Sequence, residues 1–151
     1  MFREAKGNLW ELPADARCIT TNGAVRRDGA AVMGRGCAHE AKMKFGGIDI
    51  ALGAHIKAKG NHCVALITHE IGWHLITFPV KHHWKDKADI KLIERSCQEL
   101  MAMINVYDWK NVLLPRPGCG NGHLDWETEV KPVIAPLLDE RVTVVTFDAP
   151  Q

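Results

Sequence analysis

Three glycines occupy alternate positions in the segment Pro115–Trp126, which directly follows the apolar run Asn111–Leu114. Without Cβ atoms at Gly118, Gly120 and Gly122, the backbone of such a loop can turn several main-chain N–H groups into one concavity, and a concavity of this kind binds anions. A turn that is only structural rarely needs three glycines at this spacing. The sequence therefore predicts a phosphate-binding loop here.

A second glycine-rich segment, Asn22–Ala38, begins after the β-rich run Cys18–Thr21 and leads into a predicted helix. Gly34 and Gly36 flank Arg35 at the expected start of that helix. The unpaired N–H groups of a helical first turn lie at the positive end of the helix dipole and suit a phosphate. Glycines at these positions also suit a tight strand-to-helix turn, so both interpretations stay open for this segment.

The two segments match neither of the common nucleotide-binding motifs. The Walker pattern is absent, and the dinucleotide fingerprint G-x-G-x-x-G fails because His39 and His123 stand where the last glycine should be. Cys119 suggests a phosphatase nucleophile, but no arginine follows it at a spacing that would close an anion loop around a thiolate. We therefore interpret Cys119 as a small buried residue.

One lysine has the setting of a catalytic group. Lys81 follows Pro79 at the carboxyl end of a predicted strand, and it is followed by a cluster of basic and titratable side chains, His82, His83, Lys85 and Lys87. A neighbouring cation or loss of hydration lowers the pKa of a lysine from its usual value of about 10.4. A lysine with a lowered pKa is a usable nucleophile or base.

The same segment, Lys81–Lys87, interleaves Trp84 with basic residues. This pattern suits single-stranded nucleic acid, whose phosphates pair with cations and whose bases stack on aromatic rings. A solvated loop anchored by one tryptophan is the other interpretation. The histidines form no recognisable metal-binding set, so no metal site is predicted. His123, in the second glycine-rich segment, is a candidate proton shuttle.

These candidate residues need a scaffold, and the apolar pattern predicts alternating strands and helices. Strands are expected at Cys18–Thr21, Cys63–Ile67, Leu75–Phe78 (ended by Pro79), Asn111–Leu114 and Val142–Phe147. Helices are expected at Ala38–Phe45, Ile48–Lys59, Ile90–Ile104 and Val130–Leu138, the last interrupted by Pro132 and Pro136. The alternation predicts a three-layer α/β/α domain with a mixed central sheet. Ligands bind such sheets beyond the carboxyl ends of the strands, where both glycine-rich segments fall.

Composition narrows the class of protein. The chain has 151 residues, 46% of them hydrophobic, and its 19 basic and 18 acidic side chains give a formal charge of +1. It fits one domain over residues 1–151 and is too neutral to bind nucleic acid by overall charge. Five dispersed cysteines are typical of reduced thiols. With neither a signal-peptide pattern at Met1–Glu4 nor an apolar run of membrane-spanning length, we expect a cytoplasmic protein that does not contact membranes.

Three motifs in this order resemble the macrodomain superfamily: Val32–Ala38, Phe78–Trp84 and Gly118–Trp126. The sequence is most similar to the branch that holds the antitoxin removing ADP-ribose from thymidine in DNA and the terminal ADP-ribose glycohydrolase of animals. The resemblance runs from Met1 to about Phe147, essentially the whole chain. It implies a macrodomain fold and an ADP-ribose ligand.

The resemblance also implies roles for individual residues. Asn22 would contact the distal ribose, and Lys81 would act with it at the anomeric carbon, either as an attacking amine or, still charged, by assisting departure of the attached group. Phe147 would stack on the adenine; an ordinary core phenylalanine is the alternative. The full set of implied ADP-ribose contacts is Asn8, Leu9, Thr20, Asn22, Val32, Met33, Gly34, Arg35, Gly36, Pro79, Gly118, Cys119, Gly120, Asn121, Gly122 and Phe147.

The sequence departs from the family pattern at three places. Asn8 stands where the family has an aspartate that holds the adenine amino group, and its amide oxygen can still accept that hydrogen bond. The segment Ala24–Ala30 is an insertion whose two arginines would lie over the ligand or face solvent. Gly122 replaces an aspartate of the animal enzyme, as in the antitoxin branch.

The function expected first is therefore a glycohydrolase that releases ADP-ribose from a modified nucleobase or another acceptor. A reader that binds ADP-ribose without cleaving it and a phosphatase acting on ADP-ribose 1″-phosphate are the alternatives. Retention of Lys81 in its motif favours the enzyme. No cofactor is expected, single-stranded nucleic acid near Lys81–Lys87 is a candidate partner, and we expect a monomer.

Overall fold

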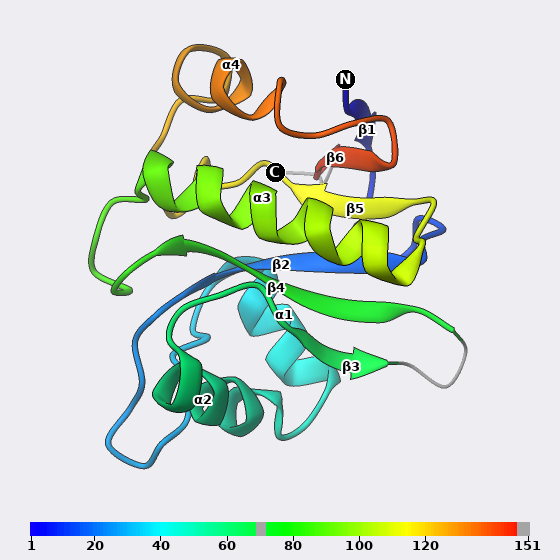
Figure 1. Cartoon of the computed structure of the whole chain (residues 1–151). Coiled ribbons are helices and arrows are strands. Elements are labelled where there is room, and N and C mark those ends of the chain that lie inside the picture. The colour runs from blue at the N-terminus through cyan, green and yellow to red at the C-terminus, as the bar shows by residue number, and fades with distance from the viewer. Residues whose placement is uncertain (69–71, 148–151) are drawn as a thin grey trace.

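The computed structural model describes residues 1–68 and 72–147 (Figure 1). Along the chain, the elements are β1 (Arg3–Lys6), β2 (Ala16–Asn22), α1 (Gly36–Lys44), α2 (Ile48–Lys59), β3 (Ala65–Thr68), β4 (His74–Lys81), α3 (Ile90–Tyr107), β5 (Val112–Pro115), a short π-helical segment η1 (Trp126–Val130), α4 (Lys131–Ile134) and β6 (Val142–Thr146). The strands of these residues form one six-stranded sheet, ordered β1-β6-β5-β2-β4-β3. Every neighbouring pair is parallel except β3 and β4, which are antiparallel.

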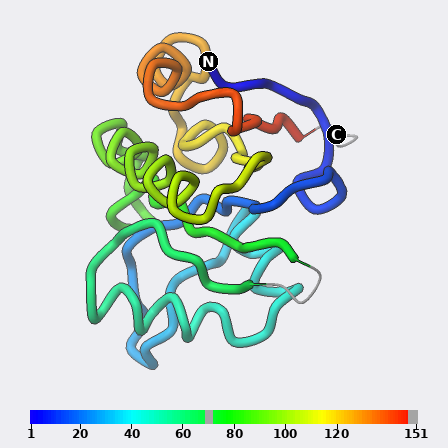
Figure 2. The backbone as a smooth tube through the Cα atoms, turned by 45° about the vertical axis from the view of Figure 1, so that its right-hand side comes forward, coloured from blue at the N-terminus to red at the C-terminus, as the bar shows by residue number. Residues whose placement is uncertain are grey.

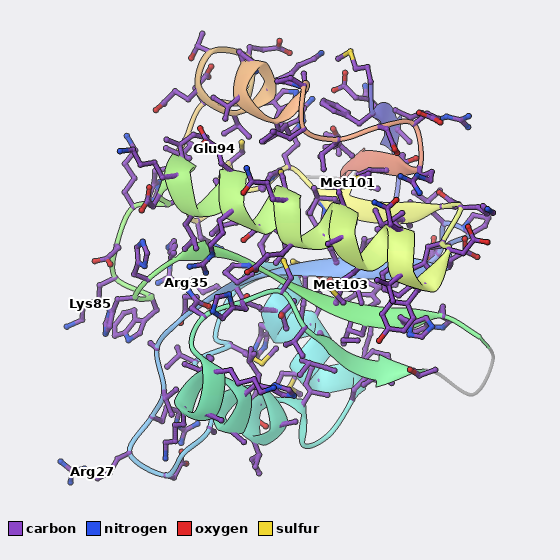
Figure 3. The ribbon with its side chains drawn as sticks, in the orientation of Figure 1. Arg27, Arg35, Lys85, Glu94, Met101 and Met103 are labelled. Carbon is purple, nitrogen blue, oxygen red and sulfur yellow. The ribbon has the colours of Figure 1, made fainter. Side chains whose placement is uncertain are left out.

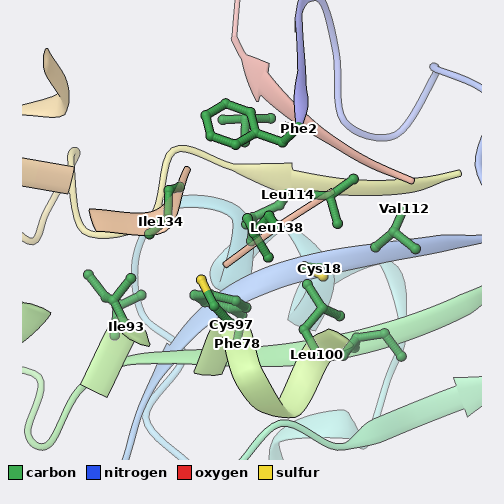
Figure 4. Close-up of a cluster of buried hydrophobic side chains, with 14 of the residues drawn as sticks. Phe2, Cys18, Phe78, Ile93, Cys97, Leu100, Val112, Leu114, Ile134 and Leu138 are labelled. Atoms are coloured by element: carbon green, nitrogen blue, oxygen red, sulfur yellow. The ribbon is translucent and has the colours of Figure 1, made fainter. Parts of the chain in front are cut away.

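Alternate residues of the central strands pack into two separate cores. Cys18 of β2 belongs to a cluster with α3 and α4, whereas its neighbour Ile19 packs with α1 and α2 on the opposite face. Strand side chains alternate in direction, so each β-rich run supplies both cores. Figure 4 shows the first core, to which α3 contributes Ile93, Cys97 and Leu100. Figures 1 and 2 show the resulting layers, which confirm the three-layer α/β/α arrangement with a mixed sheet.

Strand β4 corrects one expectation, because it runs through Pro79 to Lys81 instead of ending before the proline. The N–H of Thr77 donates to the Val64 carbonyl on the side of β3. Two residues further on, Pro79 faces the same side, where β3 no longer pairs with β4. A proline lacks the N–H that a partner would accept, so it is tolerated on such an open edge. The strand therefore carries Lys81 to its last position.

The ends of the sheet correct two further expectations. The polar segment Arg3–Lys6 is not predicted from sequence, yet it forms β1 at the sheet edge and pairs with β6. The last helix is limited to Lys131–Ile134 and follows η1. Pro132 stands in its first turn, where a missing N–H costs little, and Pro136 lies beyond its end. In the described part of the chain, no helix combines the length and the apolar character that crossing a membrane requires.

Candidate functional site

A cavity of about 940 Å³ opens at the carboxyl edge of the sheet. Strands β2, β4, β5 and β6 are parallel, so they end at this one edge. The cavity is lined by residues at or just beyond each of these ends, including Asn22, Lys81, Arg116 and Phe147. From β2 the chain passes through β3 to β4 on one side and later to β5 on the other, so the cavity lies where the strand order reverses. Open α/β sheets bind ligands at this position.

The structure brings most of the sequence-predicted site together. All of the predicted contacts line the cavity except Asn8, Leu9, Pro79 and Cys119. Asn8 instead accepts the N–H of Trp10 through Oδ1 at 2.8 Å. Leu9 and Pro79 are buried. Cys119 packs against the α3 core, and burial raises the pKa of its thiol to about 11. A direct ligand contact by any of these four stays a prediction.

The first glycine-rich loop presents the start of α1 to the cavity. Helix α1 begins at Gly36 after Arg35, no side chain caps it, and its first turn carries no acidic residue. The first helical N–H groups therefore keep their hydrogen-bonding capacity and their positive electrostatic end. Asn22 holds this loop at the end of β2, because Nδ2 donates to the Val32 carbonyl at 3.1 Å and Oδ1 accepts the Ala24 N–H at 2.9 Å.

The insertion Ala24–Ala30 lies outside the cavity. The Val32 N–H donates to the Ala24 carbonyl, and this hydrogen bond brings the two ends of the insertion together. Both of its arginines are exposed, and Arg26 pairs with Asp28 at 3.0 Å. Figure 3 shows Arg27 at the tip of the insertion, pointing away from Arg35. Of the two alternatives, the arginines therefore face solvent.

The second glycine-rich loop is fastened to the fold at both ends. The Gly118 carbonyl accepts the Leu124 N–H at 2.9 Å, and the Gly122 carbonyl accepts the Ala88 N–H at 3.0 Å. Between these points, the N–H groups of Gly120, Asn121 and Gly122 donate to no acceptor in the described residues. Three successive free donors at the cavity wall form the kind of nest that binds phosphate oxygens.

Lys81 and Asn22 lie side by side in the cavity lining. A register shift after Thr21 places Asn22 opposite Lys81 instead of opposite Val80. Such bulges re-aim side chains at the ends of strands. Val80 packs in the α3 core, so strand alternation directs Lys81 to the other face, toward α1. The Lys81 carbonyl accepts two hydrogen bonds, from the Gly23 N–H at 3.1 Å and from Nδ2 of Asn61 at 2.9 Å.

The pKa of Lys81 is lowered, but not by the sequence neighbours that suggested it. Burial is the main cause, the charge of Arg35 adds to it, and the carboxylate of Asp86 opposes both. Of the neighbours, His82 is paired with Asp89 at 2.8 Å. The cation that matters therefore comes from the first glycine-rich loop. A lowered pKa favours the neutral amine, which is the nucleophilic and basic form.

The charge of the cavity wall suits an anion. The lining includes four cations and two carboxylates: Arg35, Lys81, Lys85, Arg116, Glu40 and Asp86. The Nε atom of Arg116 is buried without a hydrogen-bond partner, although its guanidinium lies over the Trp126 ring at 4.9 Å. Across residues 1–68 and 72–147, no group of three His, Cys, Asp or Glu side chains converges to hold a metal ion.

Phe147 stands at the end of the cavity beyond β6. Its side chain is 60% exposed and lines the cavity, so the alternative of a core phenylalanine is wrong. Arg116 lines the cavity but was not among the predicted contacts, although it lies within the predicted loop Pro115–Trp126. Sequence reasoning also left Trp84 undecided, and this residue lines the cavity.

No model of a known protein family matches the chain. A protein named DNA ADP-ribosyl glycohydrolase from Thermus aquaticus is 30% identical over 147 residues, which cover 92% of this chain and 38% of that protein. A protein of the same name from Mycobacterium tuberculosis is 37% identical over 54 residues, or 36% of this chain and 15% of that protein. The chain thus spans well under half the length of these curated relatives.

Solved structures match over nearly the whole chain. The macrodomain of Thermus aquaticus DarG has a TM-score of 0.79 at 27% identity, and the alignment covers 99% of both chains. Thermosipho africanus DarTG in complex with ADP-ribose has a TM-score of 0.78 at 20% identity, covering 99% of this chain and 42% of that one. With its sheet order, its two glycine-rich loops and these likenesses, the chain belongs to the macrodomain superfamily.

Proposed function

We propose that the chain binds ADP-ribose and hydrolyses the bond that joins its distal ribose to a nucleobase in DNA. The observation that carries this proposal is the position of Lys81, whose pKa is lowered, beside Asn22 in the lining of a cavity that also has free main-chain N–H groups in its wall. These donors suit the diphosphate, and Phe147 suits the adenine. The names of the two curated relatives and the ligand of the Thermosipho structure support the same assignment.

In this reaction, the neutral amine of Lys81 acts at the anomeric carbon as nucleophile or base. As a general base, the amine takes a proton from the water that attacks this carbon; as a nucleophile, it forms a bond to the carbon that water then breaks. In either case the bond from the carbon to the nucleobase breaks, the nucleobase leaves with its electron pair and gains a proton, and water supplies the hydroxyl that remains on the sugar. Asn22 lies close enough to orient the ribose, since it pairs with Lys81 in the strand register. His123, on the cavity wall, is a candidate donor of that proton.

The test is release of free ADP-ribose from ADP-ribosylated single-stranded DNA. We expect Lys81→Ala to lower the rate by at least about a hundredfold, in the range for losing a general acid or base, while calorimetry still detects bound ADP-ribose. Lys59→Ala is the matched control, because Lys59 is exposed on α2 outside the cavity. Full activity in Lys81→Ala would remove the catalytic role. Binding of ADP-ribose without turnover of DNA, protein or ADP-ribose 1″-phosphate substrates would identify the protein as a reader that does not cleave its ligand.

A further inference from the structure

Trp84 is the most exposed of the five tryptophans. Its side chain is 48% exposed, whereas Trp109 and Trp126 are 5% exposed and the other two are half-buried. An indole that stays open to solvent can offer its ring to a ligand for stacking. Trp84 lines the cavity, which puts this open ring on the rim of the proposed active site.

The rim at Trp84 is the side of the cavity that holds the reactive amine. Nζ of Lys81 donates to the carbonyl of Trp84 at 3.3 Å, so the two residues are joined directly. In the proposed reaction, the acceptor base is attached to the carbon on which Lys81 acts. A nucleic acid strand that continues from the acceptor therefore passes the rim of the cavity at Trp84. Phe147 and Arg116 lie elsewhere in the lining, on the segments that follow β6 and β5.

The groups around Trp84 are those that a single strand requires. Nζ of Lys85 lies 5.2 Å from the centre of the indole ring, and the ring of His83 stacks on the indole with 5.5 Å between centroids. Lys85 is exposed and forms no ion pair in the described residues, so its charge is available to a phosphate. Figure 3 shows Lys85 projecting outward from this end of the molecule. Asp86 on the same rim opposes a second phosphate contact.

We propose that Trp84 is a stacking platform for the base next to the ADP-ribosylated nucleotide, and that Lys85 pairs with the phosphate between them. This inference rests on the proposed function and extends it from the acceptor to the strand that carries it. Single-strand binding of this kind works because every base offers a ring face, whereas the bases of a duplex are already stacked on each other. The site would then select an acceptor within a single strand over an isolated nucleoside.

The experiment compares two substrates, an ADP-ribosylated single-stranded oligonucleotide and the same ADP-ribosylated nucleoside without flanking nucleotides. Loss of one base–aromatic stack corresponds to roughly a five- to 150-fold change. We expect Trp84→Ala to raise KM for the oligonucleotide within this range, and to raise KM for the nucleoside far less. Trp84→Phe, which keeps a ring, should recover most of the loss. Equal effects on both substrates, or no effect on either, would overturn the proposal.

A second measurement uses binding alone, so that it stands even if the chain turns over neither substrate. A fluorescein-labelled, unmodified single strand should bind wild-type protein at low salt more tightly than a duplex does, and Trp84→Ala should weaken this binding. Lys85→Ala should reduce the slope of log affinity against log salt by about one contact's share. Tyr107→Ala and Arg27→Ala are the controls, because both residues are exposed and line no part of the cavity. Identical binding by wild type and Trp84→Ala would reject the platform, whatever the outcome for hydrolysis.

Discussion

The two glycine-rich loops reach the same cavity, but their glycines serve different purposes. In the second loop, two glycines are needed by the fold itself. A Cβ on Gly118 would lie 2.9 Å from Cδ1 of Ile93, at a φ of +78°, and a Cβ on Gly122 would lie 2.5 Å from the Gly118 carbonyl oxygen. In the first loop, a Cβ on Gly34 would meet no atom within 4 Å, and the same holds for Gly120 at the tip of the second loop.

This difference separates glycines that make the fold from glycines that make the site. Gly118 and Gly122 let the loop return against the core, which fixes the direction of the free N–H groups between them. Gly34 and Gly120 face open space in the cavity, so the protein alone gives no reason for the missing side chain. The close approach of a ligand does give one.

The largest expected effect distinguishes two glycines of the second loop, Gly122 and Gly120, by the loss of stability that an added methyl group causes. Gly122→Ala should cost about 3 kcal/mol of folding free energy, because the new methyl group meets a backbone oxygen and Cβ of Ala88 at 2.7 Å. Gly120→Ala should stay within about 0.5 kcal/mol of wild type. Urea unfolding followed by circular dichroism measures both. Equal midpoints for the two variants would contradict the distinction.

The next effect concerns the first loop and is seen only with ligand. Gly34→Ala should unfold like wild type but bind ADP-ribose about tenfold more weakly, equivalent to about 1.4 kcal/mol, since its methyl group occupies ligand space. Calorimetry measures the affinity. Gly46→Ala is the matched control, because Gly46 also has nothing within 4 Å of its added Cβ and lies outside the cavity. Wild-type affinity in Gly34→Ala would mean that the first loop does not approach the ligand.

A smaller effect tests how the first loop is joined to Lys81. At the entry of this loop, Gly23 and Asn61 both donate to the Lys81 carbonyl, and a Cβ on Gly23 would lie 2.9 Å from Nδ2 of Asn61. Asn61→Asp keeps the size of the side chain but cannot donate. We expect kcat to fall about fivefold, the value of one hydrogen bond of about 1 kcal/mol, with KM little changed. A rise in KM alone would show that Asn61 shapes the cavity and does not position the amine.

The smallest effect concerns Arg35, which lowers the pKa of Lys81 from the first loop. A cation beside an ammonium group disfavours the protonated form, so removing it by Arg35→Gln must raise the pKa of Lys81. If the neutral amine acts, the rate rises with pH through this pKa, and the rising limb of kcat should move to higher pH in the variant. Burial, the larger cause, is unchanged, so the movement should be modest. A falling limb of kcat that moves to higher pH, in place of the rising limb, would mean that the charged form acts.

The sequence could predict where the loops lie but not what each glycine does. Alternating apolar runs located five strands and the boundaries of α2, because burial imposes its period on the chain. Gly118, Gly120 and Gly122 look equivalent in a pattern, and only the fold brings Ala88 against two of them, Gly118 and Gly122, and leaves Gly120 open. The pattern that predicts strands needs apolar residues, so it does not find the polar edge strand β1.

For the site as well, the sequence predicts which residues take part but not how the fold arranges them. Lys81 and Asn22 were identified through motifs, and their pairing depends on a register shift that no local signal encodes. The cation acting on Lys81 was expected among its sequence neighbours, and it is Arg35, supplied by a distant segment. Phe147 had two interpretations in the sequence; its exposure in the fold excludes a core phenylalanine, and the adenine contact stays a prediction.

Free main-chain amides in both loops should hold one diphosphate, and titration calorimetry with ADP-ribose tests this most directly. We predict one molecule bound per chain with measurable heat, weakened in Gly34→Ala and in Gly120→Ala although both variants fold like wild type. No heat with the wild-type chain, or wild-type affinity in both variants, would contradict binding of the diphosphate by the two loops.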